Sequence, residues 1–341
     1  MKQTQRSGAE ASATGNGAKL TRGYLIALVS SAFLSTTSIL IRYLTTAYRM
    51  PPLALACWRD TFVSLSLLPV LAVVRPLLLR VARHDLVYLV GYGFVLANFN
   101  ALWTLSVALN GAAVSTVLVY CSVGFTALLG WWLLNESLDS AKLLAVALSL
   151  GGCALVSGAL NPAAWQANVV GILTGILSGL CYAFYSLLGR SAAQRGLNPW
   201  TTLFYTFGFA ALFLLFLNLL PTGLLPGIAA GPTDLFWLGN SLSGWGILFL
   251  LAAGPTVAGF GLYNVSLGYL PSSVANLILT SEPVFTAIIA YFLLAERLTG
   301  RQLGGSVMIL AGVALLRISE RRRGGRSQAK RERRIGAVSG D

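Results

Sequence analysis

The chain alternates between long apolar stretches and short polar connections. A membrane-spanning helix needs about 20 apolar residues at a rise of about 1.5 Å each, and ten stretches of about that length can be counted. They cover residues 23–44, 50–74, 86–108, 111–134, 140–160, 169–191, 199–219, 244–268, 271–294 and 300–318. The pattern predicts an all-α integral membrane protein with ten transmembrane helices.

The composition supports this fold class. A length of 341 residues would suggest two soluble domains, but 56% of the residues are hydrophobic and only 10% are charged. The four cysteines, Cys57, Cys121, Cys153 and Cys181, lie singly in different apolar runs, and the single histidine, His84, lies in a loop. Paired intramembrane carboxylates and a Gly-rich phosphate loop are also absent from the sequence. We therefore expect no metal site, no cofactor and no enzymatic activity.

The basic residues predict the orientation in the membrane. With ten helices both termini lie on one side, and the connections on that side hold most of the Lys and Arg residues. They include Arg75, Arg80, Arg83, Lys142, Arg190 and Arg195, whereas the other side has only Arg42, Arg49, Arg297 and Arg301. The positive-inside rule then predicts a cell membrane protein, in the plasma or inner membrane, with both termini in the cytoplasm.

The two ends of the chain are polar. Residues 1–22 are predicted to be a disordered cytoplasmic segment, and residues 319–341 a disordered polybasic tail. We expect the basic tail to contact anionic lipids of the inner leaflet. It has no aromatic interleaving and no folded module, which argues against nucleic-acid binding.

The second half of the chain repeats the first. Shifted by 160 positions, Gly111–Leu155 aligns without gaps on Pro271–Leu315. Phe125, Thr126, Ala127, Glu136 and Gly152 then match Phe285, Thr286, Ala287, Glu296 and Gly312. The repeat predicts two five-helix units, residues 23–160 and 169–318. Because five is odd, the second unit enters the membrane from the opposite side, and inverted repeats of this kind are typical of secondary transporters.

Several features together resemble the drug/metabolite transporter superfamily, in its bacterial EamA branch. They are the five-helix duplication, the Trp58-Arg59 pair, the run Glu282 to Thr286, and Glu136 and Glu296 at the ends of the fourth and ninth apolar runs. The resemblance covers about residues 23–318 and implies an exporter of small metabolites such as amino acids or drugs. The first repeat reads Cys-Ser-Val-Gly-Phe at Cys121 to Phe125 and lacks the proline common in the family there. A bend in the fourth run is therefore left open.

Glu282 and Pro283 lie near the middle of the ninth apolar run. A carboxylate at this depth is costly and marks a functional site. Pro283 has no N–H for the carbonyl of Leu279, so the helix should kink or open there. We expect Glu282 to bind a proton or a cationic group, with Pro283 part of the coupling or gating device. The alternative is a glutamate that locks the ninth helix to a neighbour.

Four other charged residues are given structural roles. Arg59 and Asp60 are adjacent, so they point about 100° apart on a helix and are expected to join a structural network. A minority interpretation makes Arg59 an anchor for an anion. Glu136 and Glu296 precede short turns and are expected to hold helical hairpins.

The substrate-binding residues are predicted from positions that are polar or aromatic in both repeats or at helical spacing in the sixth run. The set is Trp103, Thr116, Tyr120, Tyr182, Tyr185, Tyr263, Asn264, Asn276 and Thr280. Thr280 and Glu282 lie about 200° apart on a helix, so both face one cavity only if Pro283 unwinds the turn. Thr280 with Asn276 is the preferred pair for direct substrate contact.

These observations predict a secondary active transporter that works by alternating access on a small amphipathic substrate, with proton coupling left open. A proton-independent exchanger or facilitator is the alternative, and a nontransporting scaffold or receptor is weaker because it leaves the inverted duplication unexplained. The sequence leaves open the substrate, the direction of transport and whether the protein is a monomer or a homodimer.

Overall fold

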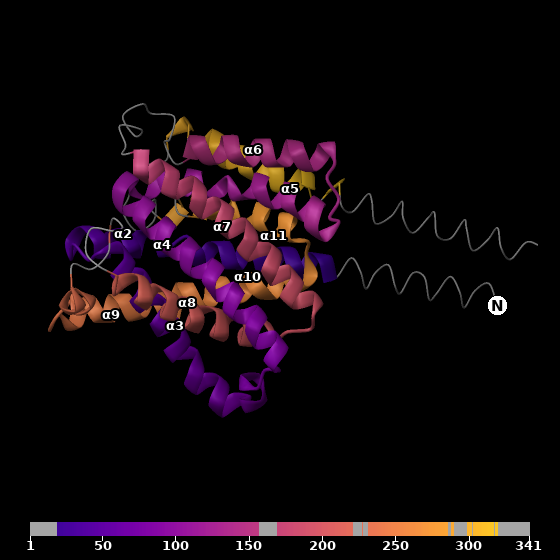
Figure 1. The fold of residues 1–341 in the computed structure, drawn as a ribbon. Coiled ribbons are helices and arrows are strands. Elements are labelled where there is room, and N and C mark those ends of the chain that lie inside the picture. Colours follow the sequence, from indigo (N-terminus) through magenta and orange to yellow (C-terminus); the bar gives the residue numbers. More distant parts are fainter. Residues whose placement is uncertain are drawn as a thin grey trace, which may run out of the picture.

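The computed structural model describes residues 19–156, 169–220, 227, 231–285, 288–289, 299–301, 303–316 and 318–319. In these ranges every regular element is helical (Figure 1). The main helices are α2 (Thr37–Ala47), α3 (Pro52–Val74), α4 (Arg83–Tyr120), α5 (Ser122–Leu134), α6 (Ser140–Val156), α7 (Val169–Gln194), α8 (Pro199–Asn218), α9 (Leu242–Leu251), α10 (Val257–Tyr269) and α11 (Ser272–Leu279). Short 3₁₀ turns form at Pro76–Leu79 and Pro232–Phe236.

Seven helical spans in this part of the chain are long and apolar enough to cross a membrane. They are Lys19–Ala47, Pro52–Val74, Arg83–Asn110, Val114–Leu134, Val169–Gln194, Pro199–Asn218 and Leu242–Tyr269. Two shorter apolar helices, Ser140–Leu155 and Leu303–Leu316, and the helical run that begins with α11 complete the set. The predicted ten-helix membrane fold is confirmed.

Helix α4 contains the span Arg83–Asn110 and the beginning of the next span, Val114–Leu134, and the chain reverses direction within it. Ser106 Oγ donates to Ser115 Oγ across 2.9 Å. Nine residues of straight helix would separate their Cα atoms by about 13.5 Å along the axis, so the two serines meet only because the chain folds back between them. The third and fourth apolar runs therefore pack as neighbours.

Helix α7 lies against α4 because its glycines let the backbones approach (Figure 1). A Cβ atom added at Gly171 would lie 2.4 Å from Asn110 Oδ1, and one at Gly175 would lie 2.6 Å from Leu118 Cδ1. Both are closer than packed atoms allow. The four-residue glycine spacing thus forms the close-approach surface typical of membrane helices.

The first helix of each repeat packs on the other repeat in the same way. Gly171, which begins α7, contacts Asn110, and its repeat equivalent Gly23 contacts Leu270, which is the repeat equivalent of Asn110. This reciprocal packing is what an inverted repeat requires, since each half supplies the helix that covers the other.

The span from Leu242 to Tyr269 is interrupted by one turn of π-helix, Ala252–Thr256, which contains Pro255. Proline removes a backbone donor, and a π-turn accommodates the freed carbonyl. The turn lies at the Gly254-Pro255 pair, the two residue types with the lowest helix propensity.

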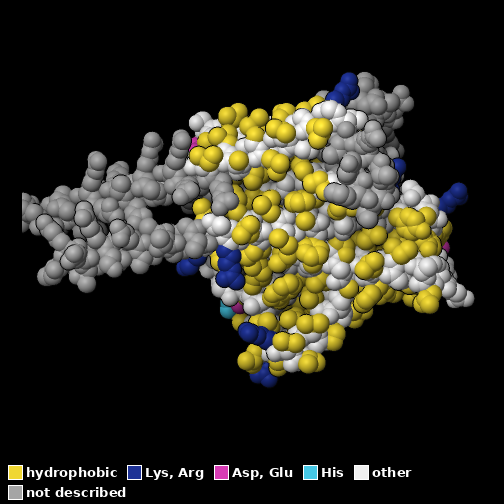
Figure 2. Space-filling view, turned by 180° about the vertical axis from the view of Figure 1, so that it is seen from behind, with side chains coloured by type: hydrophobic (Ala, Val, Ile, Leu, Met, Phe, Trp, Pro, Cys, Tyr) yellow, Lys and Arg dark blue, Asp and Glu magenta, His cyan; other side chains and the backbone are white. Residues whose placement is uncertain are grey.

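Apolar side chains cover the outside of the helical bundle. Figure 2 shows them over the face in view, with Lys and Arg toward its margins. Large side chains such as Val87, Trp132 and Leu242 are more than two-thirds exposed. A surface of this kind is stable in contact with lipid hydrocarbon and not with water.

Candidate functional site

A small cavity lies at the centre of the bundle, where helices of both repeats meet. Its volume is about 40 Å³, which leaves room for only a few water molecules. It is lined by Leu34, Thr37, Phe99, Trp103, Thr116, Val119, Tyr120, Tyr182, Phe260, Leu279 and Glu282. The walls are therefore apolar and aromatic, with few polar groups.

Glu282 is the one charged side chain among the described residues that line this cavity. Tyr120, at the end of α4, donates its hydroxyl hydrogen to Glu282 Oε2 across 2.6 Å. The two residues belong to opposite repeats. This hydrogen bond therefore joins the halves of the molecule at the cavity.

The ninth apolar run is interrupted just before Glu282. The amides of Thr280 and Ser281 donate to the carbonyls three residues earlier, across 3.1 Å each, instead of four residues earlier. Pro283 has no N–H to offer the carbonyl of Leu279, and Ser31 Oγ donates to that carbonyl across 3.4 Å. The predicted opening of this helix at Pro283 is thus present.

The first repeat has the same interruption without a proline. The amide of Cys121 donates to the carbonyl three residues earlier across 3.2 Å, and that of Gly124 does likewise across 3.1 Å. Gly179 of α7 faces this turn, and a Cβ atom added there would lie 3.1 Å from the carbonyl oxygen of Val119. Close packing of α7 thus accompanies the bend here. The fourth apolar run therefore bends although it lacks a proline.

The interruption also decides between Thr280 and Glu282. Glu282 reaches the cavity, whereas Thr280 Oγ1 donates to the carbonyl of Leu277 across 2.6 Å and is not part of the lining. Asn276 Nδ2 donates to Thr126 Oγ1 across 2.7 Å, which ties α11 to α5. The structure thus places the preferred pair in helix packing, and substrate contact by Thr280 and Asn276 stays a prediction without support from this arrangement.

Four of the predicted binding residues line the cavity, namely Trp103, Thr116, Tyr120 and Tyr182. Three others lie outside its lining. Tyr185 donates to Asn264 Oδ1 across 3.2 Å, and Tyr263 donates to Ser186 Oγ across 2.7 Å. The rings of Tyr185 and Tyr263 stack on Tyr182, each with a centroid separation of 5.9 Å. These residues hold Tyr182 in place.

Sequence reasoning missed most of the apolar wall. Phe99 and Phe260 face the cavity, but nothing in a membrane helix sequence distinguishes a phenylalanine that faces a cavity from one that faces lipid. Thr37, in the first apolar run, also lines the cavity. Comparing the two repeats did not single out Phe99 or Phe260 either.

Two polar atoms at the cavity wall have no hydrogen-bond partner in the part of the chain that is described. They are Trp103 Nε1 and Thr37 Oγ1. Trp103 is 8% exposed and Thr37 is 2% exposed. Buried polar groups of folded proteins are normally paired, so these two atoms keep an unused capacity for a hydrogen bond.

Arg59 and Asp60 are fully buried in α3 and do not line the cavity. Arg59 Nε lies 3.3 Å from Asp60 Oδ1, and Asn100 Nδ2 donates to Asp60 Oδ2 across 2.6 Å. This bond connects α3 to α4. The structural role of Arg59 and Asp60 stays a prediction.

Glu136 was expected to hold the helical hairpin in which it lies. Its carboxylate also reaches the other repeat and caps the beginning of α11. Its carboxylate accepts from the backbone amides of Ser272 and Ser273 across 2.7 and 3.2 Å, and from both serine hydroxyls. Lys142 Nζ donates to Ser273 Oγ across 2.8 Å. Glu296, the repeat equivalent of Glu136, lies outside the described residues.

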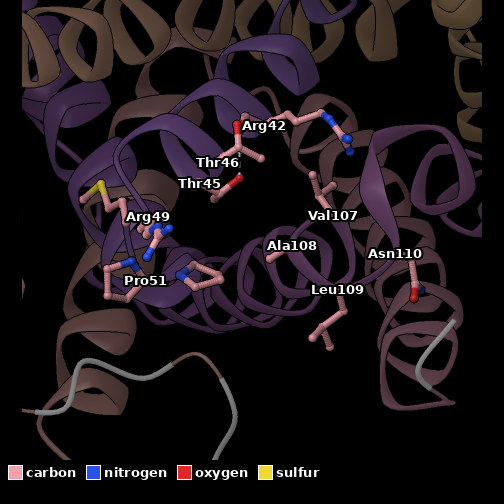
Figure 3. A pocket seen from close by; sticks show the side chains of 11 residues that line it. Arg42, Thr45, Thr46, Arg49, Pro51, Val107, Ala108, Leu109 and Asn110 are labelled. Atoms are coloured by element: carbon pink, nitrogen blue, oxygen red, sulfur yellow. Dashed lines mark hydrogen bonds between the residues drawn. The ribbon is translucent and has the colours of Figure 1, made fainter.

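A larger hollow opens at the opposite end of the bundle from Glu136. It has a volume of about 540 Å³ and is bordered by the end of α2, the following loop and the first arm of α4. Figure 3 shows Arg42, Arg49 and Asn110 around the opening. We call this hollow the vestibule. In the described residues no group of three or more His, Cys, Asp and Glu side chains could hold a metal ion.

The model of the EamA-like transporter family matches residues 21–158 and again residues 169–318. The chain belongs to the EamA-like transporter family. The family model thus matches once in each half of the sequence, and the protein is a multi-pass membrane transporter and not an enzyme.

Individual relatives give the same class. An "Uncharacterized transporter" of Archaeoglobus fulgidus is 31% identical over 71% of this chain and 80% of its own length. A "Probable amino-acid metabolite efflux pump" of Salmonella typhimurium is 28% identical over 78% of this chain and 85% of its own length. A solved structure titled "Crystal structure of protein" covers 86% of this chain and 96% of its own, with a TM-score of 0.65 and 18% identity. This last likeness shows the fold alone.

Proposed function

We propose that this transporter is a secondary active exporter of small amphipathic metabolites such as amino acids, with Glu282 as the proton-coupling site. The observation that carries the proposal is the central cavity, because both repeats build it and a carboxylate lies in its wall. A relative named as an amino-acid metabolite efflux pump supports this substrate class.

The cavity must widen to admit a substrate. At about 40 Å³ it is far below the roughly 300–1,000 Å³ of pockets that hold small organic ligands. The two interrupted helices and the π-turn at Ala252–Thr256 are the places where the bundle can bend without losing a full set of backbone hydrogen bonds. Opening toward each face in turn is alternating access.

The vestibule is the proposed exit. It lies at the far end of the first span from the termini, which is the outer side if the basic residues set the orientation. Both termini would then be cytoplasmic, in the plasma or inner membrane, with the basic tail on anionic lipid. The Glu136 cap would close the cytoplasmic side in this state.

Reconstituted proteoliposomes test the proposal. Purified protein should move radiolabelled amino acids against their gradient when a pH gradient is imposed. Glu282→Gln should abolish this proton-driven transport and leave passive exchange, because glutamine fills the same space without binding a proton. Asp85→Asn is the matched control, since Asp85 lies in the first turn of α4 and not at the cavity.

Undiminished gradient-driven transport by Glu282→Gln would remove Glu282 from the mechanism. Wild-type transport that ignores the pH gradient would select a proton-independent exchanger or facilitator in its place. Failure of every amino acid to move would reject the substrate class.

A further inference from the structure

The first span is made of two helices joined by a turn. Helix α2 begins at Thr37, after a turn at Ser35 and Thr36 within the span Lys19–Ala47. The amide and the hydroxyl of Thr36 both donate to the carbonyl of Phe33, across 3.3 and 2.9 Å. Hydroxyl groups that bond to the backbone in this way bend helices. The repeat-equivalent helix, α7, has no turn along its 26 residues, so this joint belongs to the first repeat.

The span that contains α9 has a joint at nearly the same depth. The π-turn Ala252–Thr256 separates α9 from α10. Leu34 directly precedes the turn at Ser35, and Gly259 follows shortly after the π-turn. A Cβ atom added at Gly259 would lie 2.5 Å from Leu34 Cδ2, so the two joints lie close together.

Beyond the joints, α2 and α9 are tied to each other. The hydroxyl oxygens of Tyr48 and Ser243 lie 3.0 Å apart, and Trp237 Nε1 donates to the carbonyl of Tyr48 across 2.8 Å. We call α2 and α9 the jointed pair. Helices that share a hinge region and end contacts are able to move as one body. Thr37, the first residue of α2, lines the central cavity, so a motion of the pair changes both the cavity and the vestibule.

The arginine on α2 has an equivalent at the other end of the bundle. The first helices of the two repeats align with a shift of 148 positions, which matches Arg42 with Arg190. Arg190 Nη1 donates to the carbonyl of Leu267 across 2.7 Å. The equivalent of Leu267 is Val107, and Arg42 and Val107 both line the vestibule (Figure 3). In the described part of the chain Arg42 makes no hydrogen bond with Val107, so the equivalent pairs are joined at one end and separate at the other.

We propose that Arg42 holds the vestibule shut in the opposite conformation, by donating to the carbonyl of Val107 when the jointed pair bends toward α4. A carbonyl oxygen has two lone pairs, so that of Val107 accepts this bond without leaving its helix. Inverted repeats allow the exchange, because each half adopts the conformation of the other when the site opens to the other face. This inference rests on the proposed alternating access and names the residues that hold each end closed.

The vestibule leaves Arg42 available for this bond. No Asp or Glu is among the described residues that line it, so Arg42 has no ion pair there to break. Thr45 and Thr46 donate their hydroxyl hydrogens to backbone carbonyls of α2, across 3.0 and 2.7 Å. Neither hydroxyl therefore competes for the carbonyl of Val107.

A cysteine at the closed end reports the exchange. Leu267 is fully buried beside Arg190, so Leu267→Cys reacts with a charged, membrane-impermeant maleimide only while that end is open. The rate is measured on purified protein in detergent, and protein without this substitution gives the background from the four native cysteines. Arg190→Gln should raise the rate about tenfold, as the loss of one hydrogen bond from a charged donor predicts.

Arg42→Gln should act in the opposite direction on the same reporter. It weakens the conformation in which the vestibule is shut and the Leu267 end is open, so the rate should fall about tenfold. Damage to packing around Arg42 alone would not slow a reaction at the other end of the bundle. Arg49→Gln is the matched control, because it removes the same charge from the same vestibule and should leave the rate unchanged.

An unchanged or faster reaction in Arg42→Gln would overturn the inference, as would an equal decrease in Arg49→Gln. Arg42→Met also lacks the donor groups and should behave like Arg42→Gln, so either variant that folds decides. The labelling needs neither a substrate nor a pH gradient. Its outcome is therefore independent of the proteoliposome assay, which decides the substrate and the proton coupling.

Discussion

The two repeats interrupt the equivalent helix at the same place but with different residues. In the first repeat the turn at Cys121 precedes Ser122-Val123, and in the second the turn at Ser281 precedes Glu282-Pro283. The backbone hydrogen bonds are alike on both sides. The bend is therefore not specific to proline, and the carboxylate is an addition to a shared backbone.

The two faces of the molecule also differ in their polar residues at equivalent positions of the repeats. On the face near the termini, Glu136 binds Ser272 and Ser273 at the beginning of α11. The repeat equivalents of these serines are Ala112 and Ala113, which have no hydroxyl to donate. The sequence therefore lacks these two hydroxyl donors at the other face, which is also where the vestibule opens.

Removing the cap should have the largest effect. Glu136→Ala deletes the acceptor of two amides and two hydroxyls, so we expect a loss of about 3 kcal/mol in the free energy of unfolding. The double variant Ser272→Ala with Ser273→Ala copies the first repeat and should lose less, because the amides still bind Glu136. Chemical unfolding in detergent measures both. Equal stability of Glu136→Ala and wild type would contradict the cap.

Filling the close contact at the first bend should have the next largest effect. Gly179→Leu adds atoms within 3.1 Å of a backbone carbonyl, and overpacking of this kind costs about 1–3 kcal/mol. Gly124→Leu is the control, because a Cβ atom added at Gly124 meets nothing within 4 Å. If both substitutions were tolerated equally, packing of α7 would not be what holds the bend.

Cutting the link between the repeats should have a smaller effect. Tyr120→Phe removes the 2.6 Å hydrogen bond to Glu282 and keeps the ring, so we expect a loss of about 1.5 kcal/mol. Thermal unfolding of Tyr120→Phe, Glu282→Gln and the double variant forms a mutant cycle. Strictly additive effects would show that the two residues do not interact.

Copying the first repeat at the proline should have the smallest effect. Pro283→Val introduces the residue found at Val123, where the same bend forms without proline. We expect a change below about 1 kcal/mol and retained transport. Loss of transport with normal folding would show that Pro283 does more than accommodate the bend.

Comparing the two repeats singled out some residues of the cavity wall and some that lie outside it. Trp103, Thr116, Tyr120 and Tyr182 line the cavity, and all but Tyr182 were found by comparing aligned positions. Phe99 and Phe260 were missed because an aromatic residue in an apolar helix carries no signal of direction. The choice of Thr280 over Glu282 assumed a regular helix, and the turn at Thr280–Ser281 changes the angle between them.

The sequence by itself determined the helices, their number and their duplication. These follow from local physics, because a bilayer accepts only segments that satisfy their own backbone and are apolar for about 20 residues. Only the tertiary structure decided that Glu282 faces the cavity, that Tyr120 binds it and that Glu136 reaches across to α11. The hydrogen bonds of Tyr120 with Glu282 and of Glu136 with Ser272 each join residues more than 130 positions apart. Their geometry therefore depends on how the helices of the two repeats bend and pack against each other.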